Sequence, residues 1–184
     1  MKTNAVNIAA PAGCSVFQFR VHTGTETNQN RVIDASAPET PKGYHAREFA
    51  DIYCPPNIGQ MRDLLLIGGF FGDNSFRRAI DWSTAISDPV LERTTPWDLL
   101  ALSAAYPRLD FDIGFQGEKM YVASTRDCPY IDGKPCTTRV WYRKHPRKAG
   151  ASTISCSARC ISLPYTEIIV EPFAWFLFAI RAPL

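Results

Sequence analysis

The sequence lacks the short motifs that mark several common classes of enzyme and nucleotide-binding protein. It contains no GxSxG nucleophile elbow, no protease-type cysteine motif, no P-loop and no GxGxxG turn. Such motifs recur because the chemistry needs a strained nucleophile turn or a glycine-rich cradle for phosphates. His22, His45 and His145 therefore stand beside no recognisable nucleophile. We expect a protein that is not an enzyme.

Long apolar runs and a strong net charge are also missing. The apolar run FAWFLFAI (173–180) falls far short of the roughly 20 residues that span a bilayer, and the N-terminus has no run of signal-peptide length. We therefore expect synthesis in the cytoplasm and no membrane partner. Twenty Lys and Arg against eighteen Asp and Glu give a formal charge of +2, so any contact with a polyanion must be local.

The cysteines do not form a zinc-knuckle pattern, although the chain has six of them. Cys128, Cys136, Cys156 and Cys160 follow the spacing C-x7-C-x19-C-x3-C, which lacks the CxxC pairs that present two thiolates to one ion. Without an export signal, reduced thiols are expected rather than disulfides. We predict no metal and no cofactor, and structural zinc at these four cysteines is the alternative.

Turn-forming residues and alternating apolar patterns predict a mainly β fold. The chain has 14 prolines and 11 glycines in an otherwise ordinary globular composition. Strands are predicted over residues 14–21, 109–116, 119–125, 137–144, 152–163, 165–171 and 173–180. No long helical pattern interrupts the later ones, which favours an antiparallel β-sandwich or an eight-stranded jelly roll with two or three short helices. FAWFLFAI is apolar on both faces, so it should be a central strand or a buried helix segment.

Two helices are predicted from capping signals. Asn57 can cap a helix over IGQMRDLLLI (58–67), which Gly68 would end. In the second helix Thr95 can cap and Pro96 occupies the first position, while Asp98 completes a capping box. That helix is apolar nearly all round and should be sandwiched, and Pro107 should end it at Tyr106. SFRRAIDWSTAIS (75–87) reads as weakly helical or irregular.

The segment after this helix alternates apolar and acidic residues. Asp110 and Asp112 would share the wet face of the predicted strand, roughly 7 Å apart. Two carboxylates at that spacing could hold a divalent cation or act as acid and base. An ordinary solvent-facing strand explains the same pattern.

The N-terminal region divides into a strand and a polar stretch. CSVFQFRV (14–21) has the two-residue period of a half-buried strand. Residues 22–43 have almost no apolar periodicity and are predicted to be a long loop, either a solvated linker or an arm lying across a neighbouring subunit. We accordingly divide the chain into residues 1–43, the strand and polar arm, and residues 44–184, a single β-sandwich domain.

The strongest local binding signal lies in RVWYRKHPRK (139–148). Five cations stand beside Trp141 and Tyr142, a mixture of charge and rings that suits single-stranded nucleic acid. The alternative is a solvated basic turn whose aromatic residues belong to the core. The candidate nucleic-acid-binding residues are Arg139, Arg143, Lys144, Arg147 and Lys148.

Four segments, read in order, resemble capsid proteins of picornavirus-like RNA viruses. IGQMRDLLL resembles the short helix before their third strand, and PWDLLALSAAYPRLDFDIGF resembles their second helix running into the next strand. ISLPY resembles their hydrophobic-Pro-Tyr motif, and EPFAWFLFAIRAPL resembles their terminal strand. The order and rough spacing agree over about residues 44–184.

The resemblance implies a jelly-roll capsid subunit of a small icosahedral RNA virus. Such a subunit would self-assemble with other capsid subunits into a virion, and its basic residues would meet genomic RNA with little sequence preference. The residues alone leave two alternatives open. One is a small nucleic-acid-binding or inhibitor β-domain from a phage or mobile element, built around 139–148. The other is a metal-dependent enzyme that uses Asp110 and Asp112.

Overall fold

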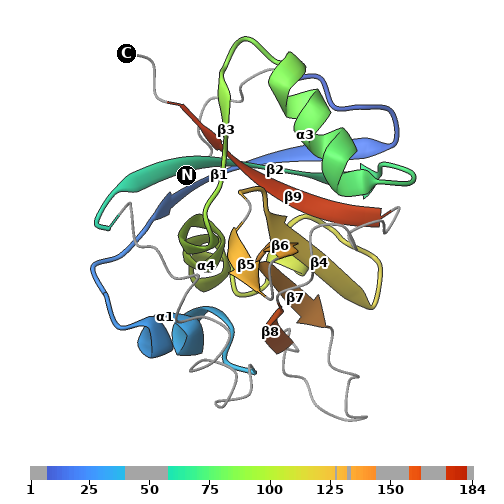
Figure 1. Ribbon diagram of the computed structural model, residues 1–184. Coiled ribbons are helices and arrows are strands. Elements are labelled where there is room, and N and C mark those ends of the chain that lie inside the picture. Colours follow the sequence, from blue (N-terminus) through green and yellow to red (C-terminus); the bar gives the residue numbers. More distant parts are fainter. Residues whose placement is uncertain are drawn as a thin grey trace.

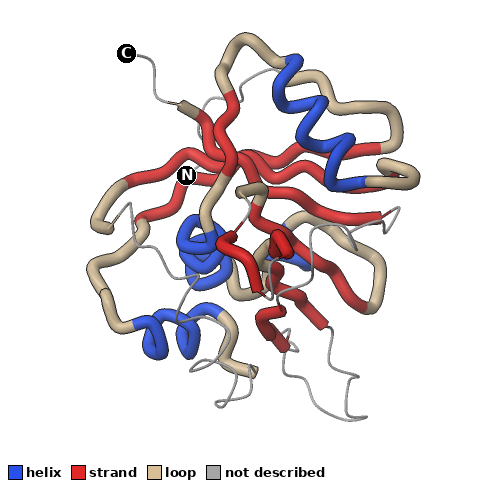
Figure 2. The backbone as a smooth tube through the Cα atoms, in the orientation of Figure 1, coloured by secondary structure: helices blue, strands red, loops and turns tan. Residues whose placement is uncertain are grey.

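A mixed β-sheet with helices on both of its faces forms the body of the molecule (Figure 1, Figure 2). The computed structural model describes residues 8–39, 58–126, 128–131, 134–143, 158–162 and 173–181. The strands are β1 Cys14–His22, β2 Met61–Phe70, β3 Leu91–Arg93, β4 Lys119–Ser124, β5 Cys128–Ile131, β6 Lys134–Cys136, β7 Arg139–Arg143, β8 Ala158–Ser162 and β9 Phe173–Ile180. The helices are α1 Gln29–Ser36, α3 Ser75–Ala85, α4 Pro96–Ala105 and α5 Leu109–Asp112. The predicted mainly β class with few helices is confirmed.

The sequence had suggested a purely antiparallel sheet, but the observed sheet is mixed. Six strands follow the order β1-β2-β9-β4-β7-β8, and β3 also pairs with β9. β4 runs parallel to β9, while the other pairs of this sheet are antiparallel. β5 and β6 form a separate two-stranded ribbon. Strands far apart in the sequence therefore meet at the centre of the sheet.

The helix predicted over residues 58–67 is wrong, because β2 occupies most of this range. Its four consecutive aliphatic residues are all buried, and they alternate between two cores: Leu64 and Leu66 pack in one, Leu65 and Ile67 in the other. A strand covered on both faces shows a continuous apolar run, which periodicity alone cannot distinguish from a buried helix.

The predicted central strand at residues 173–180 is confirmed as β9. Phe176 and Phe178 pack in the core beneath α3, and Leu177 and Ala179 pack in the core beneath α1 and α4. Trp175 lies on the opposite face from Phe176 and is half-buried. The strand therefore lies inside the sheet, with one core on each of its faces.

The second predicted helix is confirmed in detail as α4. Thr95 caps it, Pro96 stands at its first position, and Asp98 completes the capping box. The Asp98 carboxylate is fully buried and also accepts a hydrogen bond of 3.1 Å from Nε of Arg62 on β2. This buried ion pair ties the start of α4 to the sheet.

The strand predicted over residues 109–116 is wrong, because the chain forms the single helical turn α5 at Leu109–Asp112 and turn and coil over residues 113–116. The amide groups of Phe111 and Asp112 donate to the carbonyl oxygen of Arg108, so local hydrogen bonds replace those of a neighbouring strand. Gly114 follows at a φ of +71°, a conformation that glycine adopts without strain. The alternating pattern therefore predicted a strand where local hydrogen bonds form a helical turn instead.

The polar stretch at residues 22–43 also holds a helix that the sequence did not reveal. Asn28 caps α1 by accepting a hydrogen bond from the Arg31 amide at 3.3 Å. Ile33 is fully buried in the core beneath α4, and the Ser103 hydroxyl of α4 donates to the carbonyl of Ser36. Ile33 and the half-buried Val32 are the two large apolar residues of α1, too few to give a visible period, so the loop prediction fails over Gln29–Ser36.

Predictions for the remaining segments are confirmed in part. β1, β4 and β7 lie where strands were predicted, and β8 occupies the end of the range 152–163. The segment 75–87, which had no firm prediction, forms α3. The predicted strand at 165–171 lies outside the described residues.

Candidate nucleic-acid interface

Two neighbouring strands, β4 and β7, place aromatic and basic side chains on the same face of the sheet. Ala123 of β4 packs in the core beneath α3, so the alternate residues Lys119 and Tyr121 belong to that face as well. Their cross-strand partners on β7 share it. We call Lys119, Tyr121, Arg139, Trp141 and Arg143 the β4–β7 surface.

The opposite face of the same two strands is part of the protein core. Met120 and Val122 of β4 are buried there with Val140 and Tyr142 of β7. This burial fixes which side chains of the two strands remain accessible. A shift of one residue would exchange the two sets, so the core specifies the β4–β7 surface.

The β4–β7 surface consists of an aromatic row between two basic rows. Tyr121 pairs directly with Trp141, Lys119 pairs with Arg143 on one side of them, and Arg139 pairs with Ala123 on the other. Rows two residues apart along a strand are separated by about 7 Å. The two rings are half-buried, whereas Lys119 and Arg143 are exposed.

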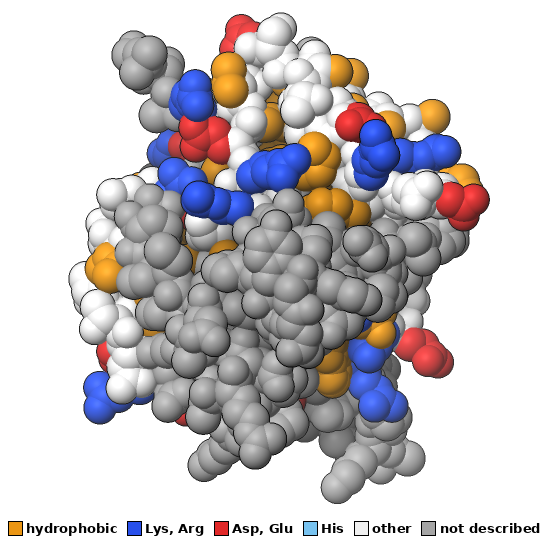
Figure 3. Space-filling view, in the orientation of Figure 1, with side chains coloured by type: hydrophobic (Ala, Val, Ile, Leu, Met, Phe, Trp, Pro, Cys, Tyr) orange, Lys and Arg blue, Asp and Glu red, His pale blue; other side chains and the backbone are white. Residues whose placement is uncertain are grey.

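Cations already contact the faces of these rings. Lys119 Nζ lies 4.4 Å from the ring centroid of Trp141 and 4.8 Å from that of Tyr121. Arg139 Cζ lies 4.2 Å from the Tyr121 ring centroid. Figure 3 shows Lys and Arg side chains beside hydrophobic ones at the lower right, where β4 begins and β7 ends in Figure 1, with an acidic side chain next to them. Such rings can stack on flat groups, and the cations can bind anions.

The structure brings together only part of the predicted binding segment. Arg139 and Arg143 lie on the β4–β7 surface, while Lys144, Arg147 and Lys148 lie outside the described residues. Tyr142 is fully buried in the core, as the alternative of a basic turn with core aromatic residues predicted, whereas Trp141 is half-buried. Neighbouring residues of a strand face opposite ways, so only one of the two rings can be accessible.

Sequence reasoning missed Lys119 and Tyr121, which β4 contributes. The alternation in KMYVAST places both on one face, which was a usable signal. Their meeting with Trp141, however, depends on the antiparallel pairing of β4 with β7, which no local pattern specifies.

The predicted pair of wet carboxylates is not formed. Asp110 and Asp112 lie on α5 rather than on a strand, and Asp110 is only 1% exposed while Asp112 is exposed. The side chains that the structure describes include no group of three or more His, Cys, Asp or Glu residues placed to hold a metal ion. The candidate metal-dependent site at these aspartates thus loses its geometric basis.

Of the cysteines, Cys14 can be placed as a free thiol. Its Sγ donates to the carbonyl oxygen of Phe70 at 3.6 Å, and burial raises the pKa of the thiol. The predicted zinc-free state of Cys128, Cys136, Cys156 and Cys160 concerns side chains outside those that the structure describes.

Comparisons with known proteins give no relative: no family model, no curated protein and no solved structure matches the chain. Within the described ranges, no helix is both long enough and apolar enough to cross a bilayer. Function must therefore be inferred from the chemistry of the β4–β7 surface.

Proposed function

We propose that this protein binds single-stranded nucleic acid through the β4–β7 surface. The observation that carries the proposal is the aromatic row of Tyr121 and Trp141 between two basic rows. One base stacks on the rings, and the phosphates on either side contact Lys119 with Arg143 and Arg139. This arrangement combines the two contacts on which single-strand binding depends, base stacking and backbone neutralisation.

Single strands suit the β4–β7 surface better than duplexes do. Bases of a duplex are stacked on one another, so a sheet-borne ring reaches a base face only in an unpaired strand. The five residues of the surface include no Asn, Gln, Asp or Glu, the side chains that read base edges alongside Arg and Lys. We therefore expect weak sequence preference.

Binding must exchange the internal cation–ring contacts for contacts with the ligand. An exposed cation–π contact contributes about 0.5–1 kcal/mol, whereas stacking of a base on an aromatic ring contributes about 1–3 kcal/mol. Lys119, whose ammonium group stands over both rings, can move to a phosphate when a base takes its place. The balance favours the bound state because the displaced cation gains an anionic partner.

Fluorescence anisotropy with a labelled oligouridylate tests the proposal. Trp141→Ala and Tyr121→Ala should each weaken binding by roughly 5- to 100-fold, because each removes one stacking ring. Tyr121→Phe is the matched control, since it keeps the ring and should bind like the wild type. Absence of binding by the wild type at low salt, or equal affinity of the alanine variants, would contradict the proposal.

The capsid-subunit function and its jelly-roll fold remain a second proposal. Two of the four segments that carry the resemblance form other elements than expected, since IGQMRDLLL contributes to β2 and LDFD forms α5. The observed elements therefore favour the nucleic-acid-binding function. Sedimentation separates the two proposals: a capsid subunit forms large closed particles, whereas a binding domain remains a monomer or a small oligomer.

A further inference from the structure

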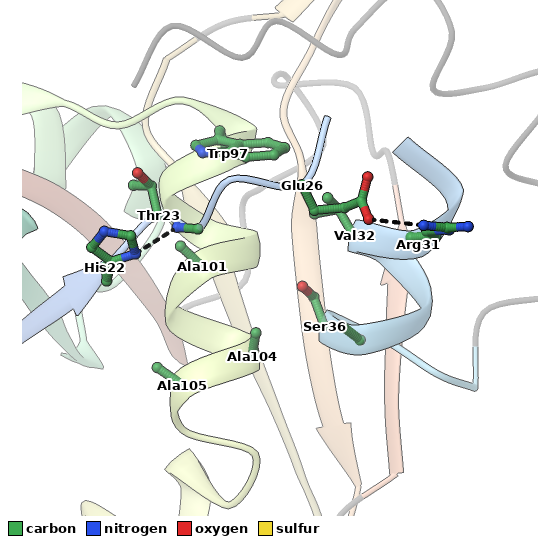
Figure 4. Close-up of a pocket in the computed structure, with 12 residues that line it drawn as sticks. His22, Thr23, Glu26, Arg31, Val32, Ser36, Trp97, Ala101, Ala104 and Ala105 are labelled. Carbon is green, nitrogen blue, oxygen red and sulfur yellow. Dashed lines mark hydrogen bonds and ion pairs between the residues drawn. The ribbon is translucent and has the colours of Figure 1, made fainter. Parts of the chain in front are cut away.

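A cavity of about 520 Å³ lies between the segment that follows β1 and the helices α1 and α4 (Figure 4). Figure 4 shows the segment from His22 to Glu26 running across α4 below Trp97, with α1 forming the facing wall. The volume lies in the range of about 300–1,000 Å³ that is typical of small-molecule sites. This cavity is separate from the β4–β7 surface, since the two share no residue.

The cavity is open because small side chains line both helices. α1 contributes Ala35 and Ser36, and α4 contributes Ala101, Ala104 and Ala105. The hydrogen bond from the Ser103 hydroxyl to the Ser36 carbonyl holds the two helices together beside this space. Val32 and Trp97 also line the space, although only 2% of Trp97 is exposed.

The polar groups around the cavity are already paired within the protein. Glu26 Oε2 lies 3.4 Å from Arg31 Nη1, so the two charged groups of the lining compensate each other. Thr23 Oγ1 donates to the Gln60 carbonyl at 3.2 Å, and the Gly24 amide donates to His22 Nδ1 at 3.0 Å.

Charge thus disfavours an ionic occupant of either sign. The Asn28 amide donates to Glu26 at 2.8 Å and lowers the pKa of this carboxyl, so it stays ionised and its charge remains offset by Arg31. The pair therefore offers no net attraction to an ion of either sign. An ion would also lose its hydration against the alanine lining without gaining a free counter-ion.

We propose that this cavity binds an uncharged, largely apolar small molecule. The apolar body of the ligand lies against the alanines of α1 and α4 and the indole of Trp97, and the paired Glu26 and Arg31 give charged competitors no net attraction. This site operates independently of nucleic-acid binding, so either proposal can fail without the other.

Two related fluorescent probes test the site with the full chain. N-phenyl-1-naphthylamine is uncharged, and 8-anilinonaphthalene-1-sulfonate has a similar aromatic body with a negative charge. The uncharged probe should bind saturably and about tenfold or more tightly than the anionic one. Trp97 lines the cavity, so excitation of tryptophan should also sensitise emission of the bound probe.

Filling the cavity provides the site-specific readout. The double variant Ala35→Leu and Ala104→Leu should weaken binding of the uncharged probe at least tenfold, and both exposed helical positions tolerate leucine. Ala85→Leu, at an exposed position of α3 away from the cavity, is the matched control and should bind like the wild type. Equal unfolding midpoints of the variants confirm that the fold is retained.

Three outcomes would overturn the proposal. The first is no saturable binding by the wild type, as expected if other residues of the chain fill the space in solution. The second is unchanged binding by the double leucine variant. The third is equal affinity for the anionic probe, which would show that charge does not select the ligand.

Discussion

Thr94 and Thr125 converge on the same backbone group, the carbonyl oxygen of Leu177, to which both hydroxyls donate. Each hydroxyl also accepts the amide of the other residue, at 2.9 Å for Thr94 N–H and 3.2 Å for Thr125 N–H. β3 and β4 meet end to end here along one edge of β9, since Arg93 pairs with Phe178 and Ser124 with Leu177. The two threonine hydroxyls thus supply hydrogen-bond partners to backbone groups at the point where β3 and β4 end.

Thr125→Val should destabilise the protein by about 1–3 kcal/mol, measured by urea unfolding. Valine keeps the shape of the side chain but leaves the buried Thr94 amide without its acceptor. Thr84→Val is the control, because the Thr84 hydroxyl is exposed on α3 and water replaces its bond to Asp81. Similar costs for the two variants would show that the hydroxyl junction contributes little.

Gly68→Ala should destabilise the protein because its new Cβ would lie 2.2 Å from the ring of Trp175, its cross-strand partner. Overpacking of this kind costs about 1–3 kcal/mol. The same substitution in a Trp175→Leu background should cost less, since the ring is then absent. Chemical unfolding of the four proteins gives the coupling energy, and a coupling near zero would contradict this contact.

Phe176→Ala should cost about 3–5 kcal/mol, and Trp175→Ala should cost less. Phe176 is fully buried and contacts the rings of Phe71 and Phe76 edge-on, whereas Trp175 is only half-buried. The free energies of unfolding of these two neighbouring variants check the assignment of their faces. The reverse order would contradict it.

Asp98→Ala should cost about 3 kcal/mol because it leaves a largely buried guanidinium without its carboxylate. Asp98 accepts hydrogen bonds from Arg62 and from the amide and hydroxyl of Thr95. Asp112→Ala is the matched control, since Asp112 is exposed and its loss should change stability by less than about 0.5 kcal/mol. Thermal or urea unfolding distinguishes these expectations.

Affinity for single-stranded RNA should fall with salt at a logarithmic slope of about −2 if three cations each neutralise one phosphate. Lys119→Gln should reduce the magnitude of this slope by about 0.7. Arg20→Gln is the control, because Arg20 lies on β1 and pairs with Asp63 at 2.7 Å. A slope that responds equally to both substitutions would place binding elsewhere on the molecule.

Local sequence determined the elements whose signals depend on neighbouring residues. The cap, the first-turn proline and the capping box of α4 act within one helical turn, so Thr95, Pro96 and Asp98 were enough to predict its start. Alternation likewise predicted β1, and turn residues on either side of apolar segments predicted β4 and β7. The fully apolar run of β9 left a central strand and a buried helix segment both open, and its pairing with β2 and β4 decided for the strand.

Tertiary structure decided the features that depend on pairing between distant segments. The aliphatic run of β2 became a strand because β1 and β9 supply hydrogen bonds on its two edges, and α1 formed where Ile33 could be buried under α4. The β4–β7 surface exists because Tyr121 and Trp141, which are 20 positions apart in the sequence, are directly paired across two strands. Local free-energy differences at such positions are small, and the burial and hydrogen bonding that outweigh them are defined only when the sheet is assembled.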